Sequence, residues 1–209
     1  KTSKWIKENS AVCELTSYPS QTITKDKLYT SALNLYSIKN ELESFLSTQT
    51  NELFDLQDTI YLYDLTNTYF EGEKRNSLLA KHGRSKEKRT DAKLVVLAVV
   101  VNVEGFIKYS SIYQGNMADC KTLSATIDSL RQATSSASKK AVVVMDAGIA
   151  TEENLKMVKA KGFDYLCVTR SKLKKYQIQS SNTIKTVYDK KEQVISLHRV
   201  MVENESDYF

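Results

Sequence analysis

The sequence predicts an α/β fold built on one mixed β-sheet with helices packed against it. From residue 59 to residue 113, stretches rich in β-branched and aromatic residues follow one another, which indicates three consecutive antiparallel strands. Two more strand-like stretches, 141–146 and 164–170, flank a helix-like segment, as in parallel strands joined by a crossover helix. With 41% hydrophobic residues the chain can build a full core, and no apolar run approaches the ~20 residues that span a membrane.

Residues 1–57 are predicted to form an N-terminal arm and a helical segment. Residues 1–22 are polar and aperiodic, so we expect a loose arm with a turn at Pro19. From Thr24, which can cap a helix, apolar residues recur at three- and four-residue steps to about residue 55. One long helix or a helical pair is expected there, packed onto the sheet; a partner-binding helix is the alternative.

The core domain is expected over residues 58–170. Its first strand, 59–63, ends on Asp64, and a charged loop leads into an antiparallel hairpin at 93–113. The strand at 141–146 ends on a second carboxylate, Asp146.

Two helices are predicted between the strands of the core. The first covers about 118–133, where Asp119 is expected to cap the helix rather than approach the Asp64 site. The second covers 151–162, with Thr151 as its cap and Gly162 as its end.

The C-terminal segment, 171–209, is predicted to begin a further β-rich region. Within it, 183–202 has the pattern of a hairpin with a charged turn at 189–192. Taken together, the order of strands and helices in the core is the succession of the ribonuclease H-like fold. In that fold the first and fourth strands are neighbours, so Asp64 and Asp146 are expected to lie side by side.

Two adjacent carboxylates repel each other, and a divalent metal relieves this by taking hard oxygen ligands. Two metals held together can activate the attacking oxygen and stabilise the leaving oxygen in phosphoryl transfer. An aspartate that ends a strand is often only structural. Because both aspartates end strands of this succession, we predict that Asp64 and Asp146 are catalytic and bind metal.

The net charge of +5 and the pI near 8.9 favour a polyanionic partner. Many of the cations follow a strand on the side expected for the aspartate pair, which favours DNA phosphate contact over a plain solvated loop. A second basic group lies at 170–175. The predicted DNA-binding residues are Lys74, Arg75, Lys81, Arg84, Lys86, Lys88 and Arg89.

The numbers and spacing of the cysteines and histidines argue against a zinc site, a disulfide framework and a histidine-rich metal site. The three cysteines are far apart in the sequence and form neither a zinc motif nor a disulfide framework, so a reduced, cytoplasmic setting is expected. The two histidines, His82 and His198, cannot form a histidine-rich metal site between them.

Four sequence blocks, in order, resemble those of bacterial insertion-sequence transposases of the Asp-Asp-Glu (DDE) group that have a β-rich insertion in the core. They are YDLTNTYFE (63–71), HGRSKEKR (82–89), GNMAD (115–119) and VMDAG (144–148). The resemblance implies a protein that, with Mg²⁺ or Mn²⁺, cleaves DNA at the ends of the element and joins the freed 3′-hydroxyl to target DNA. It also implies a homo-oligomer for the full-length protein.

On the same resemblance, Asp64 matches the first catalytic aspartate and Asp146 the second. Ala147 stands where the family often has arginine, which removes a possible DNA contact but no metal ligand. The third acid of the family is a glutamate on a helix after the β-rich insertion. We do not assign it to Glu192, Glu203 or Glu205 and expect it beyond Phe209, so that the chain is truncated, its two-metal site is incomplete and it is inactive alone.

Two other readings apply to the same residues. A haloacid-dehalogenase-like phosphatase also has a strand that ends on aspartate, but it needs a general acid at the position of Thr66, and threonine does not supply a proton well at neutral pH. A non-catalytic remnant of a transposase that only binds DNA or a partner is the main alternative. Thr66 and Tyr69 are candidates for supporting the metal site or facing DNA, as well as for packing.

Overall fold

The computed structural model describes residues 1–83, 90–133, 140–168, 177–178, 185–198 and 200–201. The chain divides into two compact units, residues 1–167 and 168–209, which are described separately below. The domain boundaries predicted at 57/58 and 170/171 stay a prediction.

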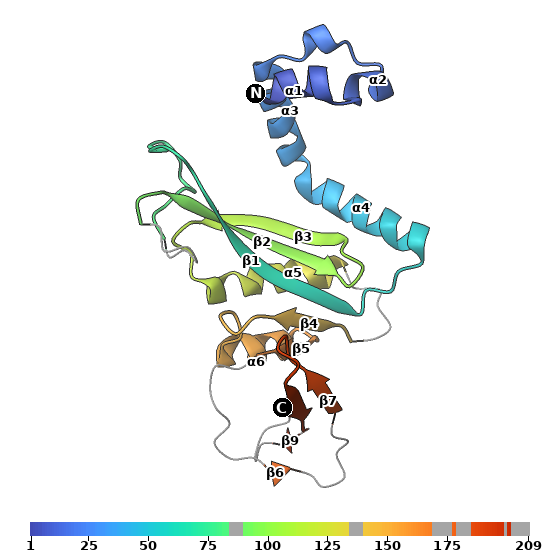
Figure 1. The fold of residues 1–209 in the computed structure, drawn as a ribbon, viewed down its shortest axis with the longest axis vertical. Coiled ribbons are helices and arrows are strands. Elements are labelled where there is room, and N and C mark those ends of the chain that lie inside the picture. Colours follow the sequence, from blue (N-terminus) through green and yellow to red (C-terminus); the bar gives the residue numbers. More distant parts are fainter. Residues whose placement is uncertain (84–89, 134–139, 169–176, 179–184, 199, 202–209) are drawn as a thin grey trace. The chain divides into compact units, whose positions relative to one another are not determined.

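The first unit is built on a five-stranded sheet in the order β3-β2-β1-β4-β5 (Figure 1). The first three strands are antiparallel, and β4 and β5 run parallel to β1 and to each other. This is the predicted ribonuclease H-like succession, and the prediction is confirmed. The strands are β1 (Ile60–Tyr69), β2 (Leu94–Asn102), β3 (Ile107–Gln114), β4 (Val142–Met145) and β5 (Asp164–Cys167).

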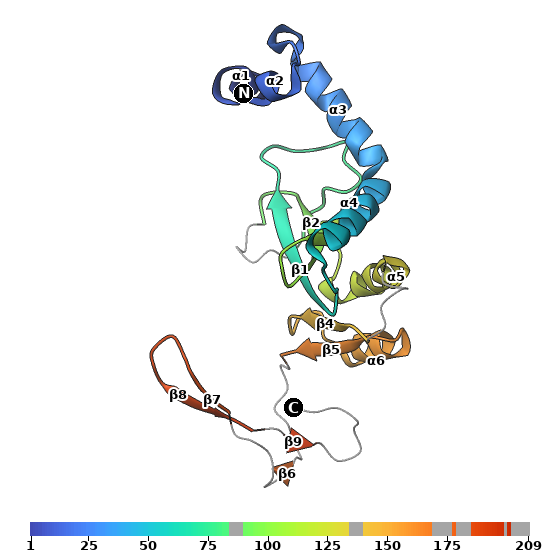
Figure 2. The same ribbon diagram turned by 90° about the vertical axis from the view of Figure 1, so that its right-hand side faces the viewer.

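Two helices cover one face of this sheet, α5 (Leu123–Ala133) and α6 (Glu152–Ala160) (Figure 2). Alternate residues of the strands point to that face, because side chains in a strand alternate with period two. In β2 every second residue from Leu94 to Val100 is fully buried or nearly so, and together with Tyr61, Ile127 and Val158 these side chains form the hydrophobic core.

The predicted helix caps are confirmed at two of three positions. The Thr24 and Thr151 hydroxyls accept hydrogen bonds from backbone N–H groups, of Lys27 at 3.2 Å and of Asn154 at 3.3 Å. The cap predicted at Asp119 is wrong: its carboxylate makes no hydrogen bond within the described part of the chain. A short 3₁₀ turn, Asp119–Lys121, precedes α5 instead, and the Asp119 carbonyl accepts from the Thr122 hydroxyl at 2.6 Å.

The loose arm expected over residues 1–22 is also wrong, because the segment is helical. It forms α1 (Thr2–Asn9), α2 (Val12–Thr16) and a 3₁₀ turn at Ser20–Thr22. Each helix also contains a local side-chain contact. An i,i+4 ion pair joins Lys4 to Glu8 in α1, and the Thr16 hydroxyl donates to the Val12 carbonyl in α2.

The expected helical pair is present as α3 (Lys25–Ser37) and α4 (Lys39–Phe54), which a single non-helical residue, Ile38, separates. Contrary to expectation, α4 does not cover a face of the sheet but lies along the free edge of β3. The backbone N–H of Ser110 donates to the Glu43 carboxylate at 3.2 Å, and the Lys39 ammonium donates to the Ser110 carbonyl at 2.5 Å. Polar side chains of α4 therefore provide hydrogen-bond partners for backbone groups of the edge strand β3 that would otherwise be exposed.

A buried ionic network fixes the C-terminal half of α4. The Lys108 ammonium, on β3, contacts the Asp58 carboxylate at 2.8 Å, and the Asn51 side chain joins both groups. Burial alone would raise the pKa of Asp58, but hydrogen bonds from Lys108, Asn51 and Asn102 outweigh burial and hold that pKa below its ordinary value. The network ties α4 to the start of β1 and to the hairpin of β2 and β3.

In the second unit, β7 (Lys185–Tyr188) and β8 (Val194–Leu197) form an antiparallel hairpin, which confirms the inner part of the predicted 183–202 hairpin. The second strand was predicted too long, because β9 (Val200–Met201) pairs with β6 (Gln177–Ile178) instead. Among the helices that the structure describes, none has the length and apolarity to cross a membrane.

Candidate active site

The register between β1 and β4 places Asp64 beside Asp146. The parallel ladder pairs Tyr63 with Met145, and the two aspartates are the next residues of each strand. Neighbouring strands lie about 4.8 Å apart, and residues paired in register point to the same face. Both side chains are exposed, on the face opposite the α5–α6 layer. The two acids predicted for the site are therefore brought together at the end of β4.

The setting of Asp64 differs from the prediction in one respect. The first strand does not end at this residue but continues to Tyr69, because the residues after Asp64 keep pairing with β2. Asp64 pairs with Val99 on that side, while its neighbour on the other side is the end of the much shorter β4. Its carboxylate has no hydrogen bond or ion pair with any described residue.

The Asp146 carboxylate is oriented by the turn that follows β4. One of its oxygens, Oδ1, accepts from the backbone N–H of Gly148 at 2.7 Å and from that of Ile149 at 3.3 Å. The second oxygen has no partner among the described residues. These two N–H groups were not predicted from the sequence. The signal was present as an Asp-x-Gly sequence directly after a buried strand.

Tyr63, the residue before Asp64, anchors this part of β1 from the buried side. Its hydroxyl donates to the Thr122 hydroxyl at 2.6 Å, at the start of α5. Burial raises the pKa of Tyr63 to about 12, so the phenol stays protonated at neutral pH and keeps this hydrogen bond. The position of Asp64 is thus fixed by a buried side chain on the opposite face of the same strand.

The aspartate pair fits a divalent cation. Asp64 and Asp146 both directly follow the Tyr63–Met145 pair, and neither has a cationic side chain paired to it among the described residues. Carboxylate oxygens are the ligands that Mg²⁺ and Mn²⁺ prefer. Within the described ranges, no group of three or more His, Cys, Asp or Glu side chains could hold a metal ion. Of the acids considered as the third ligand, Glu192 lies in the β7–β8 turn, and Glu203 and Glu205 lie outside the described residues.

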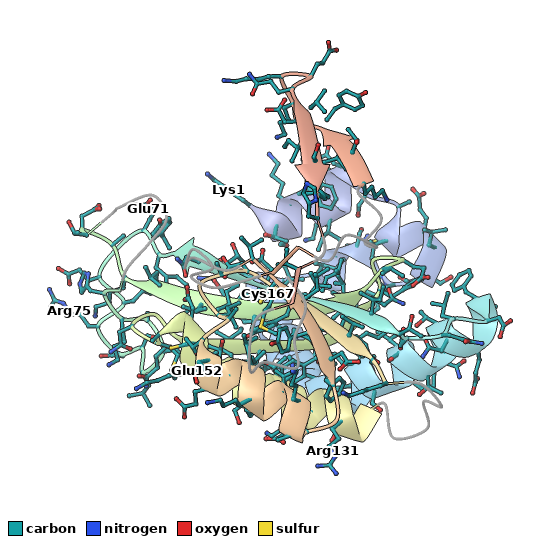
Figure 3. The ribbon with its side chains drawn as sticks, turned by 90° about the horizontal axis from the view of Figure 1, so that it is seen from below. Lys1, Glu71, Arg75, Arg131, Glu152 and Cys167 are labelled. Atoms are coloured by element: carbon teal, nitrogen blue, oxygen red, sulfur yellow. The ribbon has the colours of Figure 1, made fainter. Side chains whose placement is uncertain are left out.

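Three of the predicted DNA-binding residues are described. Lys74 is exposed and its ammonium lies over the Phe70 ring, 5.2 Å from the centroid. Arg75 is paired with Glu73, and Figure 3 shows it projecting outward from the loop after β1. Lys81 is half-buried, and its backbone pairs with Leu94. The remaining four, Arg84, Lys86, Lys88 and Arg89, lie outside the described residues, as does the second basic group at 170–175.

Two glycines, Gly83 and Gly115, allow the backbone before residues 84–89 to approach the sheet closely. A Cβ atom on Gly115 would lie 2.1 Å from the Leu94 carbonyl oxygen and 2.5 Å from that of Lys81. A Cβ atom on Gly83 would lie 1.8 Å from the Gly115 carbonyl oxygen. Both glycines belong to the family-like blocks, and the structure gives the physical reason for each: the backbones approach too closely for any side chain.

Thr66 and Tyr69 separate into two roles. Thr66 is exposed and lies on the same face as Asp64, two residues further along β1. Tyr69 is partly buried and packs against the hydrophobic core. Packing accounts for Tyr69, whereas Thr66 keeps its place near the aspartate pair.

Comparisons with known proteins give a family model and several solved structures. The family model described as "Transposase DDE domain" matches residues 55–205. The solved structures that resemble the chain include the catalytic domain of Mos1 mariner transposase, with 9% identity and a TM-score of 0.39, covering 63% of this chain and 60% of that one. Another is a synaptic complex of piggyBac transposase with hairpin DNA, with 8% identity and a TM-score of 0.41, covering 73% and 35%.

A third is a Mos1 mariner paired-end complex with Mn, with 13% identity and a TM-score of 0.37, covering 61% of this chain and 40% of that one. The chain thus spans less than two thirds of the length of each of these structures. A search of curated proteins found no match. Because the family model covers well over half of the residues, the chain belongs to the DDE transposase domain family.

Proposed function

We propose that this domain supports metal-dependent cleavage of DNA and strand transfer at the ends of an insertion sequence, with Asp64 and Asp146 as its catalytic, metal-binding acids. The observation that supports the proposal is the β1–β4 register: Asp64 and Asp146 each follow the last residue pair of that ladder, and both are exposed. The family assignment supports the same conclusion.

The two aspartates have different tasks in this proposal. Asp146 is oriented by the Gly148 and Ile149 N–H groups, so it offers its free oxygen in a fixed direction. Asp64 offers both oxygens from the middle of a strand held by two neighbours. When Mg²⁺ or Mn²⁺ is bound, it supplies charge stabilisation and an activated oxygen nucleophile for attack on a phosphodiester. Two acids provide only part of a two-metal ligand set, so we propose that catalysis requires a third acid.

The proposed partner is DNA, bound through the cationic residues that follow β1. Lys74 and Arg75 lie on the exposed loop, and the sequence from Arg84 to Arg89 adds four cations and one acid. Cations of this kind bind phosphates regardless of base sequence. We also propose a cytoplasmic location, where the DNA partner is found.

Nicking of supercoiled plasmid in the presence of Mn²⁺ tests this proposal. The 209-residue chain is compared with the polypeptide encoded by the complete reading frame around it. We expect the longer polypeptide to nick DNA and the 209-residue chain to do so weakly or not at all. In the longer polypeptide, Asp64→Asn and Asp146→Asn each abolish nicking, whereas Asp128→Asn, an exposed control on α5, leaves it unchanged. Full nicking by the Asp64→Asn variant would contradict the proposal.

The second candidate function is a non-catalytic remnant that binds DNA or a partner transposase. The exposed Lys74 on the loop after β1 is consistent with it, because phosphate contacts of this kind need no metal site. DNA binding that is unchanged in both asparagine variants, with no nicking by any form, would support the remnant. Nicking that depends on both aspartates would rule it out.

A further inference from the structure

Asn154, in the first turn of α6, is a buried polar side chain that joins two separate turns. Its amide nitrogen Nδ2 donates to the Ile149 carbonyl at 2.8 Å and to the Cys120 carbonyl at 2.8 Å. An amide NH₂ group carries two hydrogens, so both of its donors are used. Asn154 therefore ties the turn after β4 to the 3₁₀ turn before α5.

Capping of α6 does not account for these two hydrogen bonds. The cap is the Thr151 hydroxyl, which accepts from the backbone N–H of Asn154 at 3.3 Å. The side chain of Asn154 instead serves two carbonyls outside the helix, and Cys120 lies 34 positions earlier in the sequence. A buried amide that connects residues so far apart fixes the arrangement of two loops rather than the end of one helix.

On one side, the contacts of Asn154 lead to Asp146 through Ile149. The Ile149 carbonyl accepts from Asn154 and also from the backbone N–H of Thr151, at 2.8 Å. The N–H of Ile149 donates to Asp146 Oδ1, and the Ile149 side chain is buried in the hydrophobic core. Ile149 is thus held by its carbonyl and its side chain while its N–H directs the Asp146 carboxylate.

On the other side, the contacts of Asn154 lead to Asp64 through Thr122. The turn that contains the Cys120 carbonyl is closed by the Thr122 hydroxyl, which donates to the Asp119 carbonyl at 2.6 Å. The same hydroxyl accepts from the Tyr63 hydroxyl at 2.6 Å, and Tyr63 directly precedes Asp64 in β1. The Thr122 side chain is fully buried, so these bonds are shielded from water.

We propose that Asn154 is a positioning residue of the aspartate pair, which fixes Asp146 relative to Asp64 through a buried hydrogen-bond path. The path runs through Tyr63, Thr122, the 119–121 turn, Asn154 and Ile149. It is needed because β4 ends at Met145, so the strand ladder does not hold the residues after it. Buried hydrogen bonds that are all satisfied make such a network rigid.

The inference rests on the proposed function, because it gives Asn154 a task at the same site. Asn154 acts through Ile149 and not on the metal, as residues behind metal ligands commonly do. Loss of such a partner typically weakens metal binding 10- to 100-fold. The expected effect is therefore large enough to measure without any change in the carboxylates themselves.

Amide hydrogen exchange of the metal-free, ¹⁵N-labelled protein tests the positioning. Asn154→Ala should speed exchange of the Gly148 and Ile149 N–H groups by about tenfold, because the turn then opens locally. Val158→Ala, at a buried position one turn further along α6, is the control and should leave both rates unchanged. Urea unfolding shows whether the two variants lose comparable stability. Unchanged rates in Asn154→Ala, or an equal increase in Val158→Ala, would overturn the proposal.

Tyr63→Phe tests the continuity of the path from its other end. It removes only one hydroxyl, on β1, and should speed exchange of the Asn154 side-chain amide because the Thr122 turn loses a partner. This milder variant also keeps the proposal testable if Asn154→Ala does not fold. Unchanged exchange of the Asn154 side-chain amide would show that the path does not link the two strands.

Calorimetric titration with Mn²⁺ tests the consequence for the aspartate pair. Asn154→Ala should bind Mn²⁺ about tenfold more weakly than wild type, and Val158→Ala should bind it equally well. Adding Tyr63→Phe to Asn154→Ala should weaken binding little further, because both changes break the same path. Wild-type affinity in Asn154→Ala would overturn the proposal. If wild type itself binds no Mn²⁺, the proposed function fails, whereas the exchange rates, measured without metal, still decide whether Asn154 positions Asp146.

Discussion

At the scale of single residues, the turn after β4 prepares Asp146 for its proposed task. Its carboxylate would otherwise rotate freely on an exposed edge, but the Gly148 and Ile149 N–H groups hold one oxygen. The negative charge is partly balanced by these two donors, and the other oxygen stays open. Asp64 has no such support and depends on the strand and on Tyr63 for its position.

Gly115→Ala should destabilise the domain, because the new methyl group would collide with the carbonyl oxygens of Leu94 and Lys81. Overpacking of this kind costs about 1–3 kcal/mol. Urea unfolding measures the change as a lower midpoint with the same slope. Asn116→Ala, at the exposed next position, is the control and should unfold like wild type. An unchanged midpoint for Gly115→Ala would show that the backbones do not approach this closely.

Single-residue predictions from sequence succeed where the interaction is local. The caps at Thr24 and Thr151 depend on residues three positions away, and both are confirmed. The cap predicted at Asp119 does not form, because a 3₁₀ turn begins at this residue and precedes α5. In that turn it is the Thr122 hydroxyl that makes a hydrogen bond, to the Asp119 carbonyl. The close approach of Gly83 and Gly115 was not predictable, since it joins residues far apart in the chain.

At the scale of elements, strand existence was predictable and strand length was not. The hairpin of β2 and β3 and the helix α6 have strong local patterns and lie where expected. The first strand was predicted to end at Asp64 but runs to Tyr69, because β2 is long enough to pair with all of it. The orientation of α4 was also not predictable, since its apolar stripe suggested packing on the sheet and its polar side makes that contact.

Lys108→Met tests the ionic network that joins α4 to the sheet. It should lower the free energy of unfolding by about 3 kcal/mol at neutral pH, because it leaves the Asp58 carboxylate without its buried partner. Lys140→Met, which breaks the exposed Lys140–Asp164 pair, is the control and should cost less than about 1 kcal/mol.

The destabilisation by Lys108→Met should depend on pH. The network lowers the pKa of Asp58, so the stability it contributes is present above the unfolded-state pKa of about 4 and is lost as pH falls through the lower folded-state pKa. The gap between wild type and Lys108→Met should therefore narrow in acid. Urea unfolding at a series of pH values measures it, and a gap that widens below pH ~4 would contradict the assignment.

At the scale of the whole molecule, the positive charge balance supports the DNA partner that we propose. The net charge of +5 is concentrated in part along the segment that follows β1. The sequence alone could not predict the local partners of the described cations, namely the Phe70 ring for Lys74 and the Glu73 carboxylate for Arg75. The register that joins Asp64 to Asp146 was predictable only through the fold, since no local signal links the two strands.

Neutralising the cations between residues 84 and 89 should lower the affinity for DNA and make that affinity less dependent on salt concentration. Replacing Arg84, Lys86, Lys88 and Arg89 with glutamine should reduce the slope of log K against log[salt] by up to about 0.9 for each phosphate that is no longer neutralised. Fluorescence anisotropy with a duplex oligonucleotide at several salt concentrations measures the binding constant K and the slope of log K against log[salt]. A control variant with Lys156→Gln and Lys159→Gln removes two positive charges from α6, and its slope should stay close to that of wild type. A slope that is the same in the fourfold variant would place the DNA-binding surface elsewhere.

The most direct test of the central claim is a calorimetric titration of Mn²⁺ into four proteins: wild type, Asp64→Asn, Asp146→Asn and the double variant. If the two carboxylates share one cation, each single change should remove most of the binding, and the double change should add little to either one. Binding that survives in both single variants, or reductions in affinity that simply add, would show that the two aspartates do not hold the same ion.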